Sequence, residues 1–197
     1  IANFSYGIVY TGGSTGGTLT NLTIFNNSRY GIFINSSSNS TTISFSQINS
    51  TATANFASAL NINSSHYVRI INVTTNQTVG NATSILASNF TTITNSTGTS
   101  NSGAGFALWN SNFNTITNST GISASSRGIY LNSSDFTTFT NFTGISTSTS
   151  GIFISTSNSN NITNSTGISS GGEGVYLLAS NSTTITNSTF ISTSSNA

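Results

Sequence analysis

Isolated apolar residues recur along this chain at a fixed spacing, each inside a polar stretch rich in Ser, Thr and Asn. The last five, each 23 residues after the one before, are Ile93, Ile116, Phe139, Ile162 and Ile185. Earlier members of the series, at spacings of 23, 27 and 24, are Ile70, Ile43 and Leu19. A period of this size predicts a solenoid, in which each repeat buries its apolar side only by stacking on its neighbours. We therefore expect one domain, residues 1–197, of about eight coils.

Three short strands are predicted within each coil, separated by polar corners. The first is of the type Thr92–Thr94, whose middle Ile faces inward and whose threonines face outward, as alternation on a strand requires. The second is of the type Gly128–Leu131, with two inward aliphatic residues and an outward tyrosine between them. The third is the stretch Gly121–Ser123. The absence of proline and the abundance of Thr, Ile and Phe favour strands over helices.

Composition changes this picture little but excludes several classes of function. Ser, Thr and Asn make up 104 of the 197 residues, and only the regular apolar positions argue against disorder. With three basic and two acidic side chains, the chain offers no charged track for nucleic acid. The absence of cysteine excludes disulfides and thiolate metal sites. No apolar run is long enough to span a membrane, and the absence of methionine indicates that a start residue and any targeting segment have been removed or lie outside this piece.

Equivalent strands run in the same direction in every coil, so we expect parallel pairing with like side chains stacked on like. Two residues after each apolar anchor, this stacking produces a column of asparagines that is interrupted by Phe45. Its members are Asn21, Asn72, Asn95, Asn118, Asn141, Asn164 and Asn187. Because an amide carries both a donor and an acceptor, we expect these side chains to point inward and form a ladder along the axis. An inward asparagine could not carry a glycan.

Two further columns mark corners of the coil. Four residues before the anchors stand turn residues that are able to bond the main chain: Asn39, His66, Asn89, Asn112, Asp135, Asn158 and Asn181. The second strand opens on glycine in six coils: Gly7, Gly31, Gly105, Gly128, Gly151 and Gly174. We expect these glycines to adopt backbone angles that other residues avoid.

The pattern N-x-I-x-N-S-T-x-I followed by G-I-Y-L resembles a known repeat. It is similar to the right-handed parallel β-helix repeat of NosD-type proteins, pectate-lyase-like folds and large archaeal and bacterial surface adhesins. The resemblance covers essentially the whole chain and implies an all-β fold, a right-handed parallel β-helix with 23-residue coils. It says little about function, because this fold hosts lyases, hydrolases, binding proteins and structural fibres.

Candidate catalytic residues are scarce. Enzymes of the resembled fold use clustered carboxylates, and polysaccharide hydrolysis needs two carboxyl groups roughly 5 to 10 Å apart. Asp135 and Glu173 belong to coils two apart and to different corners, so they cannot form that pair. His66 has no Cys, Asp or Glu beside it that would complete a metal site or orient it as a base. We predict no catalytic residue, no cofactor and no metal site.

Sequons for N-glycosylation are dense, with nineteen Asn-x-Ser/Thr triplets in the chain. A chain so rich in Asn, Ser and Thr also produces such triplets by chance. We expect some exposed ones to be modified, with the best candidates in loops or at strand ends: Asn26, Asn35, Asn63, Asn76, Asn81 and Asn132. An uncharged, hydroxyl-rich exterior suits a place outside the cell or on its surface.

The sequence best fits a structural protein without catalytic activity, a subunit of an extracellular filament or surface fibre whose partner is a second copy joined head to tail. The alternative is an adhesin or glycan-binding stalk, in which outward aromatic residues stack on sugars. Those residues are Tyr130, Phe153, Tyr176 and Trp109. A Thr-x-Thr column, interrupted at Arg69 and Asn161, also resembles ice-binding solenoid faces. A polysaccharide lyase is the remaining alternative.

Overall fold

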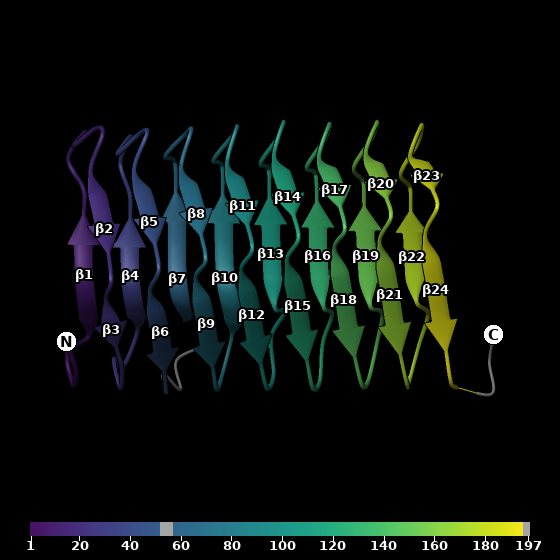
Figure 1. Ribbon diagram of the computed structural model, residues 1–197, viewed down its shortest axis with the longest axis horizontal. Helices are drawn as coiled ribbons and strands as arrows, with labels where there is room; N and C mark the ends of the chain where they lie inside the picture. The colour runs from purple at the N-terminus through teal and green to yellow at the C-terminus, as the bar shows by residue number, and fades with distance from the viewer. Residues whose placement is uncertain (52–56, 195–197) are drawn as a thin grey trace.

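The computed structural model describes residues 1–51 and 57–194, which form an elongated solenoid (Figure 1). Within these residues each of eight coils contributes three strands, and no helix is present. Equivalent strands of successive coils form three eight-stranded sheets along the length of the molecule. The predicted all-β solenoid of eight coils with three short strands each is confirmed.

The three sheets are named here by the order in which a coil visits them. The first sheet contains β1 (Tyr6–Tyr10), β4 (Tyr30–Ile34), β7 (Ser58–Asn63), β10 (Asn81–Leu86), β13 (Phe106–Trp109), β16 (Ile129–Asn132), β19 (Ile152–Ser155) and β22 (Val175–Leu178). The second contains β2 (Thr18–Thr20), β5 (Thr42–Ser44), β8 (Arg69–Ile71), β11 (Thr92–Thr94), β14 (Thr115–Thr117), β17 (Thr138–Thr140), β20 (Asn161–Thr163) and β23 (Thr184–Thr186). The third contains β3 (Thr23–Ile24), β6 (Gln47–Ser50), β9 (Thr74–Gln77), β12 (Thr97–Ser100), β15 (Thr120–Ser123), β18 (Thr143–Ser146), β21 (Thr166–Ser169) and β24 (Thr189–Ser192).

Strand pairing is parallel and joins each coil to the next. In the second sheet, Ile93 lies between Ile70 and Ile116, its equivalents 23 residues away on either side. The repeat length in the sequence is therefore one full turn of the solenoid. Side chains of one kind stack along the axis, as the fixed spacing predicts.

Apolar side chains fill the core, most of them from the first two sheets. On β16, Ile129 and Leu131 are fully buried, whereas Tyr130 between them faces outward and is partly exposed. The second sheet adds one inward apolar residue per coil, such as Ile116. Third-sheet strands with the sequence TGIS turn their glycine and serine inward. In these coils the core tapers toward the third sheet, whereas β3 and β6 contribute the fully buried Ile24 and Ile48.

The glycines that open the first-sheet strands lie where two backbones meet. None of these six has a positive φ, so the expectation of special backbone angles is wrong. Instead, a Cβ atom placed on Gly98 of β12 would lie 2.5 Å from the carbonyl oxygen of Gly105. Gly121 approaches Gly128 in the same way one coil later. Glycine is needed because the main chains of the first and third sheets pass against each other with no room for a side chain.

The asparagine column at the corner between the second and third sheets points outward, which corrects the predicted buried ladder. Six members are exposed and Asn72 is half-buried. The one side-chain hydrogen bond within the column, from Asn141 Nδ2 to Asn118 Oδ1 at 2.9 Å, is itself exposed. All members have a left-handed backbone, with φ between 48° and 54°, which Asn tolerates better than most residues. The residues concerned are Asn21, Asn72, Asn95, Asn118, Asn141, Asn164 and Asn187.

Buried serines form the inward ladder instead. Ser96 Oγ accepts the Val73 N–H at 3.1 Å and donates to the carbonyl of Thr94 at 2.9 Å. Ser119 Oγ in turn accepts the Ser96 N–H. A second serine column, before the second sheet, runs unbroken through seven coils: Ser38, Ser65, Ser88, Ser111, Ser134, Ser157 and Ser180. These hydroxyls satisfy buried N–H groups at corners where the strand ladder is interrupted.

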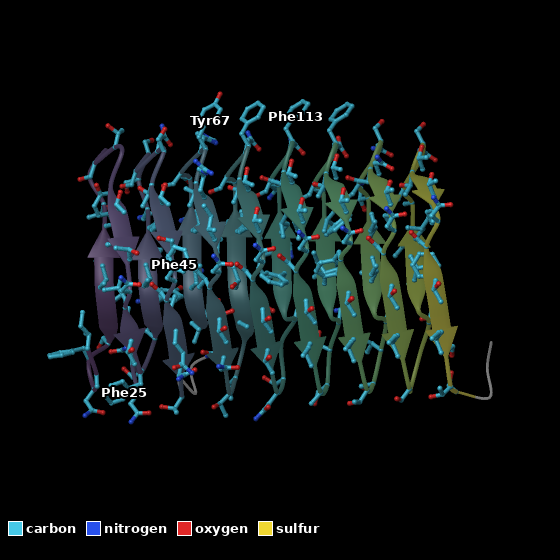
Figure 2. All side chains as sticks on the ribbon, viewed as in Figure 1. Phe25, Phe45, Tyr67 and Phe113 are labelled. Atoms are coloured by element: carbon cyan, nitrogen blue, oxygen red, sulfur yellow. The ribbon has the colours of Figure 1, made fainter. Side chains whose placement is uncertain are left out.

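Four exposed aromatic rings stack at the corner between the first and second sheets (Figure 2). They belong to Tyr67, Phe90, Phe113 and Phe136, one from each of four consecutive coils. Successive ring centroids are 4.9, 5.2 and 4.9 Å apart, and the rings are within 8° of parallel. All four residues have a positive φ. This stack was not predicted from the sequence.

Candidate functional site

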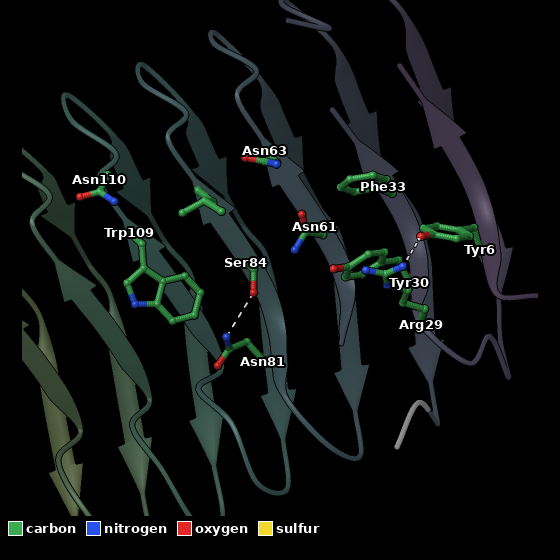
Figure 3. Close-up of a pocket in the computed structure, with 11 residues that line it drawn as sticks. Tyr6, Arg29, Tyr30, Phe33, Asn61, Asn63, Asn81, Ser84, Trp109 and Asn110 are labelled. Carbon is green, nitrogen blue, oxygen red and sulfur yellow. Dashed lines mark hydrogen bonds between the residues drawn. The ribbon is translucent and has the colours of Figure 1, made fainter. Parts of the chain in front are cut away.

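The outer face of the first sheet carries a groove of about 570 Å³ between two groups of aromatic side chains (Figure 3). It crosses the sheet from β1 to β13, over five coils of the N-terminal half. Its lining residues are Tyr6, Arg29, Tyr30, Phe33, Asn61, Asn63, Asn81, Ser84, Leu86, Trp109 and Asn110.

One wall of the groove is an aromatic cluster held by an arginine. The rings of Tyr30 and Phe33 stack with their centroids 4.9 Å apart. Arg29 donates from Nη1 to the Tyr6 hydroxyl at 2.7 Å, and its guanidinium carbon lies 5.6 and 5.4 Å from the Tyr6 and Tyr30 ring centroids. A cation placed over ring faces is attracted by their quadrupoles, so Arg29 fixes both tyrosines in place.

The opposite wall is formed by Trp109, at the end of β13. Its indole packs edge-on against Tyr130 of the next coil, with centroids 6.0 Å apart and an interplanar angle of 87°. In Figure 3 the indole lies on the same side of the sheet as Asn81 and Ser84. Because the chain contains one tryptophan, the optical signal of this wall can be measured without interference.

The floor of the groove is polar and uncharged. Asn81 donates from Nδ2 to Ser84 Oγ at 3.2 Å, and its Oδ1 accepts the Ala104 N–H at 2.8 Å. Ser84 Oγ also shares a hydrogen bond of 2.7 Å with Ser58. The Asn61 amide lies beside Ser84 on the neighbouring strand. Amide and hydroxyl groups, each able to donate and accept, are therefore gathered between the aromatic walls.

The groove exists because the side chains of one outward column are smaller in the middle of the sheet than on either side. From β1 to β22 that column reads Val9, Phe33, Asn61, Ser84, Ala107, Tyr130, Phe153 and Tyr176. Three consecutive coils carry an amide, a hydroxyl and a methyl where the coils on either side carry rings. The break in this aromatic column is visible in the sequence and was the signal that the sequence analysis missed.

Aromatic faces beside amide and hydroxyl groups suit one class of ligand, a neutral saccharide. Sugar rings present C–H faces that pack on aromatic rings and hydroxyl groups that pair with amides. Concave sites of this volume with a few convergent polar groups are typical of ligand binding. Arg29 is the one ionisable side chain other than tyrosine among the lining residues.

The structure separates the four aromatic residues that the sequence analysis named for sugar stacking. Trp109 lines the groove, whereas the other three form a ladder beyond it. Arg127 lies over the rings of Tyr130 and Phe153, at 4.7 and 4.5 Å from their centroids. Phe153 is only 7% exposed, so its ring offers no open face and the expectation of sugar stacking there is wrong. Tyr176 remains exposed.

The ionisable residues considered for catalysis have structural partners. His66 Nδ1 accepts the Asn89 N–H at 3.0 Å, and Asp135 Oδ1 accepts the Asn158 N–H at 2.5 Å. Both side chains thereby take the place of asparagines in the corner column that bonds each coil to the next. Glu173 accepts from Ser150 Oγ at 3.1 Å. Among the described residues no three His, Cys, Asp or Glu side chains come together as a metal site would require.

The six sequons proposed in loops and at strand ends differ in their surroundings. Asn26 is exposed, and the other five are half-buried. Asn63 and Asn81 line the groove. Asn76 Nδ2 donates to Asn49 Oδ1 at 2.7 Å. The remaining two, Asn35 and Asn132, lie just after β4 and at the end of β16.

Comparison with known proteins addresses the fold. A family model described as right handed beta helix region matches residues 58–197, more than two thirds of the chain. The chain belongs to the right-handed β-helix family. No curated protein and no solved structure gives a match. Family membership confirms the resemblance seen in the repeat. Because β-helix proteins include both enzymes and structural proteins, it leaves the function to be argued from the surface.

Proposed function

We propose that this β-helix is a structural protein of an extracellular or cell-surface fibre, whose subunits stack head to tail. The observation that carries the proposal is the uncovered core at each end of the solenoid. Leu177 and Ile185, in the last coil, are 37% and 40% exposed, whereas their equivalents one coil earlier, Ile154 and Ile162, are fully buried. Exposed core of this kind favours a further coil stacked upon it.

The opposite end is open in a matching way. Strands β1 and β2 each pair on one side only, as do β22, β23 and β24, whereas Ile1 and Ala2 lie along the outer edge of β3. Ile8 and Leu19 in the first coil are partly buried, whereas Ile32 and Ile43 beneath them are fully buried. Since the first and second sheets present a parallel edge at both ends, a second copy can continue these two sheets. Such a contact does not close on itself, so the product is a filament.

Surface chemistry supports the remaining parts of the proposal. Neither acid has a second carboxylate beside it, since Asp135 bonds the next coil and Glu173 bonds Ser150, so we propose no catalytic activity. An exterior of hydroxyls and amides with nineteen sequons suits N-glycosylation outside the cell. In the described residues, no helix has both the length and the apolarity needed to cross a bilayer.

Electron microscopy combined with analytical ultracentrifugation tests the stacking. The chain should form filaments at high concentration, with an axial repeat of about 38 Å for eight coils spaced about 4.8 Å apart. Substituting Leu177→Lys and Ile185→Lys should abolish them, because stacking would bury two unpaired charges. Thr140→Lys, on the outer face of a central coil, is the control and should leave filaments unchanged. A monodisperse monomer at millimolar concentration would refute the proposal.

Saccharide binding is a second candidate function, favoured by the groove beside Trp109. In this form the solenoid is an adhesin or glycan-binding stalk, with sugar rings between the Tyr30 and Trp109 walls. Probing a glycan array with the labelled chain should identify a neutral oligosaccharide, and titration with it should then shift the Trp109 fluorescence. Asn61→Phe, which would restore the aromatic column and fill the groove, should abolish that shift. Tyr176→Ala, outside the groove, should preserve it. An array without any neutral glycan bound would rule out this function.

A further inference from the structure

The outward asparagine column coincides with a row of sequons. Each of its seven members begins an Asn-x-Thr triplet whose threonine is the first residue of a third-sheet strand. In the coil of Asn95, the side chain of Ser96 points inward, and Thr97 begins β12. One corner geometry, repeated along the axis, therefore turns the asparagine of every triplet toward solvent.

Main-chain bonds hold this corner without the amide groups. The Asn95 N–H donates to the carbonyl of Thr117 at 3.1 Å, and the Asn118 N–H donates to that of Thr140 at 3.0 Å. Apart from the bond between Asn141 and Asn118, no side-chain hydrogen bond is formed by the seven asparagines, which all lie in the described residues. The Nδ2 groups of the six asparagines other than Asn141 are therefore available for modification in the folded protein.

Phe45 shows that the corner accepts a bulky outward substituent. It occupies the asparagine position of its coil with the same left-handed backbone, at φ 48°. Its N–H donates to the carbonyl of Ile71 at 3.0 Å, as the asparagines do to theirs. Its ring is 62% exposed. A group larger than an amide can therefore project from this corner while the ladder between coils stays intact.

At the other corner, the sequons of Asn39 and Asn89 lack this freedom. Asn39 Oδ1 accepts the His66 N–H at 2.6 Å, and Asn89 Oδ1 accepts the Asn112 N–H at 2.7 Å. Both side chains are half-buried, and Asn89 precedes a member of the aromatic stack. A glycan attached to Nδ2 there would have to leave the hydrogen bond of Oδ1 to the next coil intact. It would also have to avoid the stacked rings.

We propose that the exposed asparagine column carries the N-linked glycans of this protein, in preference to the loop sequons. This inference rests on the proposed extracellular function. In the transfer, Nδ2 forms a bond to the anomeric carbon of a lipid-linked oligosaccharide, the bond from that carbon to the pyrophosphate breaks, and one amide proton is released. Since successive coils are only about 4.8 Å apart, a glycan on one coil blocks its neighbours, and occupied sites alternate.

Glycopeptide mass spectrometry tests the assignment on the chain secreted from eukaryotic cells, using only the folded, monodisperse fraction. Peptide N-glycosidase converts each glycosylated asparagine to aspartate and so marks its position. One variant carries Thr97→Val, Thr120→Val and Thr166→Val, which remove three sequons of the column and keep the β-branched shape. The matched control carries Thr91→Val, which removes the sequon of Asn89. The hydroxyl of Thr91 is buried without a hydrogen-bond partner.

The expected result is that marked sites lie in the column, with no two in adjacent coils. Removal of an occupied sequon frees the neighbouring asparagines that its glycan had blocked. In the triple variant, glycans should therefore move to other asparagines of the column or be lost. The control should be glycosylated at the same asparagines as the parent protein. Glycans confined to Asn26, Asn35 or other loop sequons, or an unmodified folded protein, would overturn the inference. Filament formation by unglycosylated protein from bacteria tests the stacking separately, so the two failures are distinguishable.

Discussion

Single residues at the corners decide how this chain turns. Among residues 1–51 and 57–194, twenty-five non-glycine residues have a positive φ, and most recur at equivalent corners of successive coils. Asn118 and Ser119 have different roles at such a corner. The asparagine adopts the left-handed backbone, and the serine turns inward and accepts a hydrogen bond from the neighbouring coil. A left-handed residue costs roughly 1–3 kcal/mol unless its side chain tolerates that region. The polar residues at the corners therefore determine the backbone conformation as well as the chemistry of the surface.

The left-handed corner predicts an unusual ranking of substitutions at Asn118. Asn118→Gly should leave the free energy of unfolding nearly unchanged, because glycine adopts positive φ at no steric cost. Asn118→Val should lower it by about 1–3 kcal/mol, because a β-branched residue is strained there. Urea unfolding of the two variants measures the difference. Equal losses would mean that the exposed amide pair with Asn141, and not the backbone, stabilises this corner.

Removal of one buried serine hydroxyl should cost more than its size suggests. Ser111→Ala leaves the Ser88 N–H, which donates to Ser111 Oγ at 3.1 Å, buried without an acceptor. An unsatisfied buried group costs about 1–3 kcal/mol, so thermal unfolding should occur at a clearly lower temperature. Ser125→Ala, at an exposed position, is the control and should change little. Similar melting temperatures for the two variants would contradict the ladder.

At the scale of elements, the stacked aromatic column explains why four coils place a ring at a left-handed position. The equivalent residues of neighbouring coils are Ser40 on one side and Ser159 on the other, both also left-handed. Serine is therefore compatible with the corner, and the rings are present for their contacts with one another. Aromatic pairs contribute about 0.5–1.5 kcal/mol beyond their buried area.

Position within the stack should set the cost of losing a ring. Phe113→Ser removes two ring contacts and should lower the free energy of unfolding about twice as much as Phe136→Ser, which removes one. Chemical denaturation of both variants and of the double variant measures this. An equal loss from the two single variants would show that the rings act independently.

The fold could be predicted from the sequence because its period is fixed, whereas side-chain direction at the corners could not. Alternation along a strand correctly placed Ile93 inward and its flanking threonines outward. At the corner after β11 alternation no longer applies, since Asn95 has a left-handed backbone and the next residue turns inward. The groove was missed for a different reason. It depends on Asn61 and Ser84 being smaller than their neighbours in the column, which is a difference between coils and not a feature of the repeat.

On the scale of the whole molecule, stability comes from stacked neutral groups. The chain has five charged side chains in all, and the described residues contain no ion pair between a basic group and a carboxylate. The coils are held together by ladders of hydrogen bonds among N–H, carbonyl, hydroxyl and amide groups, without the ion pairs that other proteins have on their surfaces. Because each coil contacts only its neighbours, the stability is a sum over coils and their interfaces.

Salt should therefore have little effect on this protein. Between 10 and 200 mM sodium chloride, the Debye length falls from about 30 Å to below 10 Å, which weakens exposed charge interactions. With so few charges to screen, the melting temperature should stay constant within about 1 °C over that range. Calorimetry at several salt concentrations checks this. A shift of several degrees would reveal an electrostatic contribution that the contacts do not show.

The constant coil length of 23 residues from Ile70 onward also means that the length of the molecule can change by whole coils. Deleting residues 95–117 joins Thr94 to Asn118, so a corner asparagine still follows the strand and every later column keeps its alignment. The shortened chain should fold as a rod about 4.8 Å shorter, whereas removing 20 residues should misalign every column beyond the cut. Duplication or loss of one repeat in the gene would thus change the length of the rod by one coil spacing and leave the surfaces of the other coils unaltered.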